Sequence, residues 1–324
     1  MGVSAPMLSV VIPVYNEEQS LQALFDRLYP ALDELGVSYE VLFVNDGSRD
    51  RSPAMLKDQF LKRPEVTRVI LFSGNYGQHM AIVAGFEHSR GERIVTLDAD
   101  LQNPPEEIGK LLSAMDAGHD YVGGVRRTRE DSWWRRVASK AMNRVRHRIT
   151  HIEMTDQGCM LRAYSRDIVR AVAASREVST YIPALAYTYA NDPIEVEVEH
   201  AERVAGESKY SLYKLIRLNF DLITGFSLVP LQMFSMFGML VSVGALLAYL
   251  VVIIDRLILS GWREGMATLW DRDILAFFLL GMVLFGLGLV GEYVGRIYQQ
   301  VRERPRFTIQ ALLEQKQNDA ARPQ

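Results

Sequence analysis

The sequence predicts an α/β domain with a Rossmann-like, mostly parallel sheet, followed by a membrane-associated segment. Between residues 8 and 125, short runs rich in β-branched residues alternate with helical patterns, which is typical of parallel sheets with right-handed crossovers. Acidic residues follow several of these runs, and two long apolar runs lie late in the chain. We therefore expect a soluble domain over residues 1–208, an amphipathic helix over 209–229, a two-helix anchor over 230–297 and a tail over 298–324.

Size, charge and cysteine content limit the class of protein. The chain has 324 residues with a net charge of -3, so no global basic field points to a nucleic-acid partner. Cys159 is the only cysteine, which excludes a disulfide framework and suits a reducing compartment. The N-terminus has no basic region followed by a long apolar run, so we expect no cleavable signal peptide.

The alternating pattern assigns the elements of the first domain in order. Helices are expected after three capping residues, Asn16, Ser52 and Asn103, the last two followed by Pro53 and Pro104 at the first helical position. The first of these helices is an apolar repeat that ends at Leu35, and a further helix is expected over Gly77–Ser89. Pro30 falls inside the first repeat, so a kink or an early end is expected there. Five buried strands are expected at Leu8–Pro13, Tyr39–Val44, Thr67–Phe72, Arg93–Leu97 and Asp120–Val125.

Two carboxylates, Asp98 and Asp100, come where the fourth strand should end. Side chains two apart in a strand share a face, and two close carboxylates repel unless a cation joins them. Gln102 adds a neutral oxygen, so this stretch predicts a hard divalent cation together with a phosphate-bearing substrate. The alternative is a turn into a solvated loop.

The carboxyl ends of parallel strands meet at one edge of a sheet, where ligands bind. Polar groups also follow the first two strands, at Tyr15–Glu17 and Asn45–Asp46, which favours a site over a turn. No Gly-rich dinucleotide or P-loop pattern follows the first strand, and the glycines at 286, 288 and 291 are interpreted as helix packing. His147 and His151 lack the Glu of a zinc protease and are interpreted as solvated.

The later part of the chain predicts contact with a membrane. The arginine-rich stretch Arg126–Arg148 contains Trp133 and Trp134, a combination that suits an anionic headgroup at an interface, although a solvated basic helix is the alternative. Lys209–Val229 is amphipathic, which predicts a helix lying in the membrane interface. The alternative is a helix packed on the soluble domain.

Two uncharged runs, Leu231–Ile254 and Ile274–Gly291, are long enough to span a bilayer core of about 30 Å, with a pair of buried core helices as the alternative. Basic residues flank the pair and are fewer between the runs, so both termini are expected in the cytoplasm. The polar tail after Gln310 is expected to fray.

Three stretches carry a resemblance to a known family. Pro13–Glu18, Asn45–Ser48 and Asp98–Pro105 resemble the inverting family 2 glycosyltransferases with a GT-A fold, and within them the polyprenyl-phosphate glycosyltransferases related to dolichyl-phosphate mannose synthase. The resemblance runs from about Leu8 to Phe307. Three further stretches are similar to the members that transfer 4-deoxy-4-formamido-L-arabinose: Asn75–His79, Gly158–Tyr164 and Gly206–Ser211.

The resemblance implies a role for individual residues of this chain. Asp100 and Gln102 would bind Mg²⁺ or Mn²⁺, and Arg135 and Ser139 would hold the acceptor phosphate. Asp100, Arg126 and Asp156 are the expected catalytic residues, Asp156 lying near the reaction centre. Asn45 departs from the family, which often has Asp there. The expected donor-binding residues are Pro13, Tyr15, Glu17, Asp46, Asp98 and Ala99, with Arg126, Arg203 and Lys209 on the donor phosphates.

The resemblance also implies an activity. It is the inverting transfer of 4-deoxy-4-formamido-L-arabinose from a UDP donor to undecaprenyl phosphate, at the cytoplasmic face of a bacterial inner membrane, in a lipid A modification linked to polymyxin resistance. Gln78 and His79 either line the sugar site or start a helix. A homo-oligomer is expected, as relatives form tetramers. The alternatives are transfer from UDP-glucose or GDP-mannose, and a non-catalytic membrane adaptor. No Gln-x-x-Arg-Trp motif is present, which indicates a single transfer.

Overall fold

The structure, a computed structural model, describes residues 6–126, 154–156, 158–175, 181–201, 231–234, 236–238, 240–241, 244, 272–301 and 305–315. The chain divides into two compact units. One comprises Met1–Ser211 with Arg304–Gln324, and the other comprises Leu212–Glu303. The domain boundaries expected from the sequence stay a prediction.

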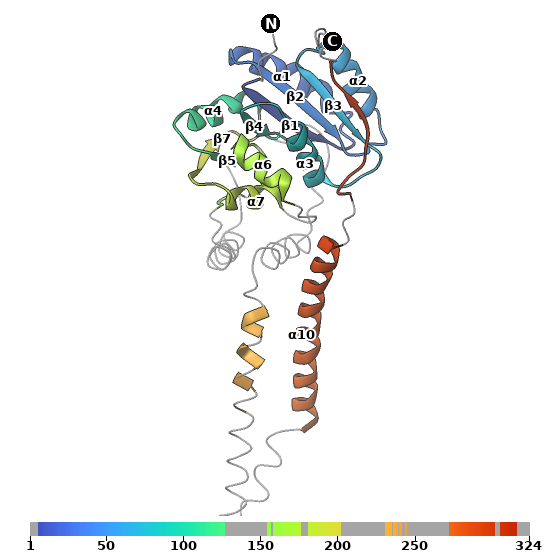
Figure 1. The fold of residues 1–324 in the computed structure, drawn as a ribbon, viewed down its shortest axis with the longest axis vertical. Helices are drawn as coiled ribbons and strands as arrows, with labels where there is room; N and C mark the ends of the chain where they lie inside the picture. Colours follow the sequence, from blue (N-terminus) through green and yellow to red (C-terminus); the bar gives the residue numbers. More distant parts are fainter. Residues whose placement is uncertain are drawn as a thin grey trace, which may run out of the picture. The chain divides into compact units, whose positions relative to one another are not determined.

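The described part of the first unit is built from strands and helices that mostly alternate (Figure 1). Its strands are β1 Leu8–Val14, β2 Tyr39–Asn45, β3 Thr67–Phe72, β4 Arg93–Thr96, β5 Tyr121–Arg126, β6 Arg162–Ser165, β7 Pro193–Val198 and β8 Ile309–Leu313. Its helices are α1 Leu21–Glu34, α2 Ser52–Lys62, α3 Gln78–His88, the 3-10 turn η1 Pro105–Glu107, α4 Ile108–Asp116, α6 Arg166–Ala174 and α7 Ile182–Thr188.

These strands form an eight-stranded sheet in the order β7-β5-β6-β4-β1-β2-β3-β8. Strand β1 pairs in parallel with β2 and β4, β2 with β3, and β5 with β7. Only β6 and β8 run antiparallel to their neighbours in this part of the sheet. The predicted mostly parallel α/β fold is confirmed, and the five predicted strands lie within one residue of the observed bounds.

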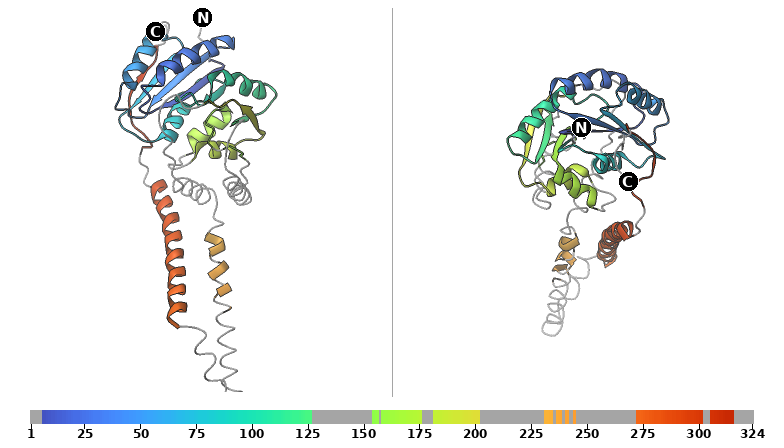
Figure 2. Two further views of the ribbon diagram at one scale, coloured as in Figure 1. Left: turned by 180° about the vertical axis from the view of Figure 1, so that it is seen from behind. Right: turned by 45° about the horizontal axis from the view of Figure 1, so that its top comes forward.

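Helices cover both faces of the sheet, as the two views in Figure 2 show. Successive strand residues point to opposite faces. In β3, Val69 and Leu71 therefore join the larger core with residues of α1, α2 and α4, whereas Ile70 and Phe72 pack with Ala81 and Ala84 of α3. Because both faces of the sheet are covered, every residue of β3 is buried.

Three predicted helix caps are wrong, although the second helix does begin at Ser52. The first helix begins at Leu21 after Ser20, whereas Asn16 has a φ of 55° and uses its side-chain oxygen to accept from the Arg49 backbone NH. The cap of η1 is Pro104 and not Asn103, which is buried. Helix α2 is preceded by Arg51, and Ser52 is its first residue. A polar side chain near a helix start has other uses when a neighbouring loop lies within reach.

Two predicted ends of regular structure are also wrong. Helix α1 continues through Pro30 to Glu34, so the early end does not occur, and the alternative, a kink at Pro30, stays a prediction. The chain after Gln310 does not fray where it is described, because Ala311–Leu313 belong to β8 and pair with β3. Both errors arose from local sequence signals that packing against the sheet overrides.

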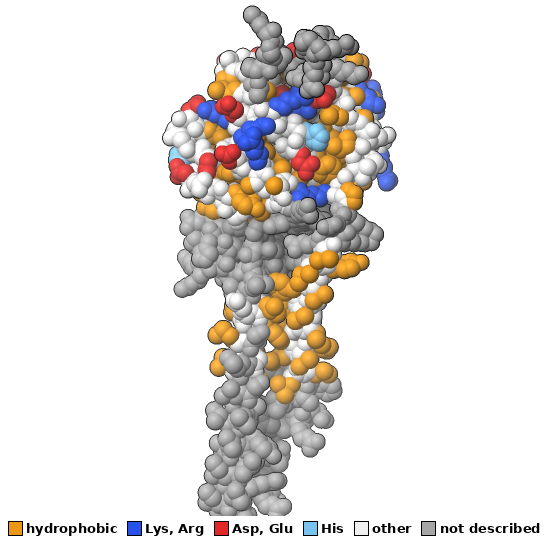
Figure 3. Space-filling model, in the orientation of Figure 1, with side chains coloured by type: hydrophobic (Ala, Val, Ile, Leu, Met, Phe, Trp, Pro, Cys, Tyr) orange, Lys and Arg blue, Asp and Glu red, His pale blue; other side chains and the backbone are white. Residues whose placement is uncertain are grey.

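The described part of the second unit includes α10, Arg272–Val301, a single helix of 30 residues. Many of its apolar side chains are exposed, among them Leu284, Phe285 and Leu287, and Figure 3 shows hydrophobic side chains along it. A Cβ at Gly286 would clash with Phe234, whereas one at Gly288 or Gly291 would meet nothing within 4 Å. Among the described residues, the predicted packing role therefore has support at Gly286 and not at Gly288 or Gly291. Among the residues that the structure describes, no helix meets the length and apolarity needed to cross a membrane, and most of Leu231–Ile254 falls outside them.

Candidate active site

The loops that follow β1 and β2 are joined by hydrogen bonds at the carboxyl edge of the sheet. The backbone NH of Asn16 donates to Ser48 Oγ over 3.0 Å, and that of Glu17 donates to Ser52 Oγ over 2.9 Å. Glu17 also accepts from Ser20 Oγ over 2.7 Å. Tyr15 is left 46% exposed and Pro13 is half-buried. The structure thus brings the predicted nucleotide-binding residues of β1 to this edge.

Asp46 organises the next loop. Its Oδ1 accepts from the Tyr76 backbone NH over 2.6 Å and its Oδ2 from the Gly77 NH over 2.9 Å. Burial raises the pKa of Asp46 above its ordinary value, although these two hydrogen bonds act to lower it. Gly47 has a φ of 68°, and a Cβ there would lie 2.4 Å from the backbone of Gly74, so only glycine fits. Asp46 thereby fixes the chain that leads into α3.

The acidic stretch lies beyond the end of β4 and not within it, which corrects the predicted strand geometry. Strand β4 ends at Thr96, and Leu101 has a left-handed φ of 61°, so the chain turns inside the motif. Asp98 is half-buried and Asp100 is 8% exposed. Asp98 Oδ1 accepts from Gln78 Nε2 over 2.7 Å, and Asp100 Oδ1 accepts from the Gln102 NH over 3.1 Å. A strained turn of this kind often marks a functional site.

The oxygens of this turn fit a divalent cation of the magnesium type. Asp100 offers a buried carboxylate and Gln102 a half-buried amide, and Mg²⁺ is often held by one or two protein oxygens with substrate phosphates. Within the described residues, no group of three His, Cys, Asp or Glu side chains is arranged to hold a metal. Ala99, between the two carboxylates, is buried at 4% exposure.

Arg126 and Asp156 form a partly buried ion pair at the end of β5. Arg126 Nε donates to Asp156 Oδ2 over 2.5 Å, and Nη2 donates to Oδ1 over 2.7 Å. Burial acts to raise the pKa of Asp156, but the hydrogen bonds and charge of Arg126 outweigh it and hold that pKa below its ordinary value. Asp156 therefore stays ionised at neutral pH. The sequence predicted both residues and not that they pair.

Comparison with known proteins places these features in a family. The model of the family described as Glycosyl transferase family 2 matches residues 9–173. The chain belongs to glycosyl transferase family 2. The match spans β1 to α6, and so contains the acidic turn, Arg126 and Asp156.

Two relatives are similar to this family 2 chain along nearly its whole length. The undecaprenyl-phosphate 4-deoxy-4-formamido-L-arabinose transferase of Edwardsiella ictaluri is 46% identical over 314 residues, 96% of each chain. The protein of the same name from Aeromonas hydrophila is 45% identical over 309 residues, 95% of this chain and 94% of that one.

A solved structure has a similar fold. Glucosyl-3-phosphoglycerate synthase from Mycobacterium tuberculosis, in complex with Mn²⁺, uridine diphosphate and phosphoglyceric acid, aligns with a TM-score of 0.50 at 16% identity. The alignment covers 68% of this chain and 76% of that one. The GT-A-like fold predicted for the first unit is confirmed at this level.

Some predicted site residues lie outside the described part of this glycosyltransferase. Arg203 and Lys209, expected on the donor phosphates, are among them, as are Arg135 and Ser139, expected on the acceptor phosphate. The basic stretch with Trp133 and Trp134 also falls there. These assignments, like the ligands assigned to Pro13, Tyr15, Glu17, Asp46 and Asp98, stay predictions.

Two residues near the site were missed by the sequence analysis. His200 follows β7, and its Nδ1 is buried without a hydrogen-bond partner among the described residues. Burial lowers the pKa of His200, the charge of Arg126 lowers it further, and the charges of Asp156 and Asp100 oppose the shift. A lone histidine has no spacing signal, so only the fold brings it to these groups.

The second missed residue is Arg162 of β6, whose side chain is fully buried. Its Nη2 donates to the Asp156 carbonyl over 2.6 Å and its Nε to the Cys159 carbonyl over 2.9 Å. Its Nη1 donates to the Tyr121 hydroxyl over 2.7 Å. Arg162 thus holds the turn that carries Asp156. A charged residue inside a strand gives a weak strand signal, which is why both β6 and this role escaped prediction.

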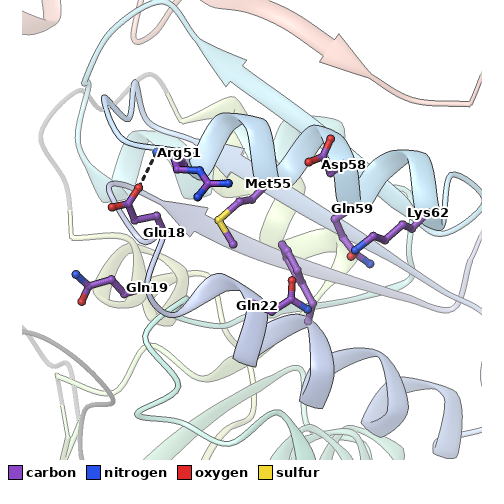
Figure 4. Close-up of a pocket in the computed structure, with 9 residues that line it drawn as sticks. Glu18, Gln19, Gln22, Arg51, Met55, Asp58, Gln59 and Lys62 are labelled. Atoms are coloured by element: carbon purple, nitrogen blue, oxygen red, sulfur yellow. Dashed lines mark hydrogen bonds between the residues drawn. The ribbon is translucent and has the colours of Figure 1, made fainter.

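A separate polar pocket of about 440 Å³ lies between α1 and α2 (Figure 4). In it Glu18 accepts a hydrogen bond from the Arg51 backbone NH over 3.0 Å. None of the predicted site residues lines this pocket, so the site is defined by the strand-end loops and not by the pocket. Its lining is Glu18, Gln19, Gln22, Phe25, Arg51, Met55, Asp58, Gln59 and Lys62.

Proposed function

We propose that this protein transfers 4-deoxy-4-formamido-L-arabinose from a UDP donor to undecaprenyl phosphate with inversion of the anomeric carbon. The observation that carries the proposal is the 46% identity, over 96% of both chains, to a transferase of that name. The strand-end loops support it, because they carry carboxylates, an amide and an arginine, the groups that could bind a metal ion and a diphosphate.

The reaction is a single displacement at the sugar. An oxygen of the undecaprenyl phosphate forms a bond to the anomeric carbon while the bond from that carbon to the UDP oxygen breaks, and the electron pair leaves with UDP. The phosphate nucleophile is already anionic at neutral pH, so no strong general base is needed. Asp156, with a lowered pKa, is a poor base and acts instead by holding Arg126.

Charge on the leaving diphosphate is the main demand on the site. Arg126 uses Nε and Nη2 for Asp156. Its remaining nitrogen, Nη1, makes no hydrogen bond within the described part of the chain, and we assign it to a phosphate oxygen. Asp100 and Gln102 would hold a Mg²⁺ or Mn²⁺ ion, which would neutralise diphosphate charge as it develops. The Mn²⁺-containing relative of similar fold supports this choice of ions.

The acceptor places the reaction at a membrane. We propose that Leu231–Ile254 and Ile274–Gly291 anchor the chain in the cytoplasmic membrane, with residues 209–229 in the interface and both termini in the cytoplasm. The support is the two uncharged runs and the exposed apolar side chains of α10. Such an anchor lets the headgroup reach the site while the prenyl chain stays in lipid.

The anchor is tested by cysteine labelling in a background in which buried Cys159 is replaced by Ala. A reagent confined to the outer side should label Ser260→Cys and should not label Ser4→Cys. Labelling in the opposite order would overturn the orientation, and labelling of both or of neither in sealed vesicles would overturn the two-span anchor.

The activity is tested with purified protein in detergent, undecaprenyl phosphate, Mg²⁺ or Mn²⁺, and equal concentrations of UDP-4-formamido-arabinose, UDP-glucose and GDP-mannose. Preferential formation of the formamido-arabinosyl lipid is expected. Preferential transfer of glucose or mannose would remove the arabinose assignment and leave the chemistry standing. Absence of transfer and of metal-dependent donor hydrolysis with all three donors would favour the non-catalytic adaptor.

A further inference from the structure

His79 has an unusual environment for a histidine at the start of a helix. It is the second residue of α3, and its Nδ1 is buried with no hydrogen-bond partner among the described residues. His88, at the other end of the same helix, has its Nδ1 2.9 Å from the Ala84 carbonyl oxygen. Because buried polar atoms in native proteins are nearly always paired, an orphaned one calls for an explanation such as a ligand.

The neighbours of His79 belong to the candidate active site. Gln78, the preceding residue, donates to Asp98 over 2.7 Å, and Gly77 donates to Asp46. On the other side, the His79 ring packs edge-on against Tyr181, with centroids 5.4 Å apart. Tyr181 in turn interacts electrostatically with Arg162 and Asp156. The imidazole therefore lies between the carboxylates of the donor side and the Arg126–Asp156 pair.

Both rings of this contact are uncharged near neutral pH. Burial lowers the pKa of His79 to about 4, and burial raises the pKa of the Tyr181 hydroxyl above its ordinary value. A neutral imidazole has one nitrogen that donates and one that accepts a hydrogen bond. Such a group matches an uncharged amide, which also offers a donor and an acceptor.

We propose that His79 is a specificity-determining residue of the donor site, and that its Nδ1 forms a hydrogen bond with the formamide of the donor sugar, beside the ring of Tyr181. This inference rests on the proposed function. A hydroxyl in place of the formamide can also form a hydrogen bond, but it is shorter by the formyl group and would leave the nitrogen out of reach. Sites built around a buried polar partner reject analogues that leave it unpaired.

The test separates the two ring nitrogens of His79. In His79→Asn the side-chain amide takes the position of Nδ1, in His79→Gln it takes the position of Nε2, and His79→Phe keeps a ring and removes both nitrogens. Each variant of the full-length chain is assayed with the formamido donor and with its hydroxyl analogue. His88→Asn on the same helix is the matched control. Binding of UDP alone and the melting temperature are measured for every variant.

We expect His79→Phe to lower kcat/KM for the formamido donor by about 10- to 100-fold, with little change for the hydroxyl analogue and for UDP affinity. His79→Asn should retain most of the preference, and His79→Gln should lose it. An equal loss for both donors, a parallel loss of UDP affinity, or a preference that survives in His79→Phe would each overturn the proposal, as would retention in Gln but not in Asn. If His79→Phe does not fold, the Asn and Gln variants decide the matter.

The outcome also distinguishes this inference from the proposed function. Wild-type protein that transfers only the hydroxyl sugar contradicts the proposed function itself. Wild-type protein that prefers the formamido sugar, together with a His79→Phe variant that keeps the preference, contradicts only the role of His79.

Discussion

The two ends of the sheet use buried polar groups in different ways. At the amino end, Glu40 accepts from Ser9 Oγ over 2.6 Å and from Arg68 Nη1 over 3.0 Å. Arg68 also donates through Nε and Nη2 to Glu314, at the end of β8, which accepts from Arg90 as well. Both Glu40 and Arg68 are buried. Here the buried polar groups pair with other side chains of the protein, and the network joins five segments of the chain.

At the carboxyl end, backbone NH groups hold the carboxylates of Asp46 and Asp100 in loops with left-handed residues. Three buried polar atoms at this end have no hydrogen-bond partner among the described residues: Asn45 Oδ1, His79 Nδ1 and His200 Nδ1. The comparison teaches that a buried charge paired with other side chains of the protein indicates a role in stabilising the fold. Buried groups fixed by loops next to orphaned atoms indicate a place prepared for a ligand.

The largest effect is expected on transfer activity, from a substitution at the carboxyl end of the sheet. Asp100→Asn keeps the Oδ1 that accepts from the Gln102 NH but removes the charge, so transfer should fall by about 10³-fold or more while the melting temperature changes little. Lipid-linked product formation and thermal unfolding measure the two quantities. Asp116→Asn, an exposed carboxylate, is the control. Full activity of Asp100→Asn, or of wild type in excess chelator, would contradict the metal assignment.

At the amino end of the sheet we expect the opposite result: Glu40→Ala should lower stability and leave transfer unchanged. It leaves Arg68 buried without one of its partners, and breaking a buried ion pair lowers the free energy of unfolding by about 3–5 kcal/mol. Transfer per folded molecule at low temperature should be unchanged. Glu106→Ala removes the exposed partner of Arg27 and is the control. It should lower the free energy of unfolding by less than about 1 kcal/mol. Loss of transfer in folded Glu40→Ala would break the distinction between the two ends.

A smaller effect concerns pH and the orphaned histidine. His79 has a folded pKa of about 4 against about 6.5 in an unfolded chain. Between these values the unfolded chain binds a proton that the folded chain does not, so the free energy of unfolding falls as pH decreases, by about 1.4 kcal/mol per pH unit. Asp156, with its lowered pKa, acts in the same direction below about pH 4. Melting temperatures at pH 7.5 and 5.0 should differ less in His79→Asn than in wild type; equal differences would contradict the neutral, buried imidazole.

The smallest effect is expected at the ion pair between Arg126 and Asp156. Asp156→Asn leaves Arg126 without its carboxylate partner, so we expect kcat to fall by about 10- to 100-fold with little change in acceptor KM. Steady-state kinetics with varied donor and acceptor measure this. Unchanged kcat would show that Arg126 does not depend on Asp156 for its position.

Much of the fold could be predicted because the central strands carry dense apolar runs between clear turns. The missed strands lack this signal. Strand β6 is four residues long with a buried Arg162, β7 alternates Glu with apolar residues and is mostly half-exposed, and β8 lies in a polar tail. Their places depend on long-range pairing that no local pattern encodes.

The candidate site was predictable to the extent that it follows strand ends. Asp46, Asp98 and Asp100 were found because topology brings the ends of parallel strands together. The pairing of Arg126 with Asp156 was not found, because 30 residues separate them. The unpaired nitrogens of His79 and His200 could not be predicted either, because the lack of a hydrogen-bond partner depends on which groups the fold brings near the side chain.

Strand β8 has a consequence for how the protein is made. It covers the β3 edge of the sheet, where every residue of Thr67–Phe72 is buried. Of the described strands it is the last to leave the ribosome, after the whole of Leu212–Glu303. Until then β3 presents an open, apolar edge on which a second chain can pair. A nascent chain therefore carries an aggregation hazard through the synthesis of its second unit. Premature termination before Ile309 should direct it to inclusion bodies instead of yielding a shorter enzyme.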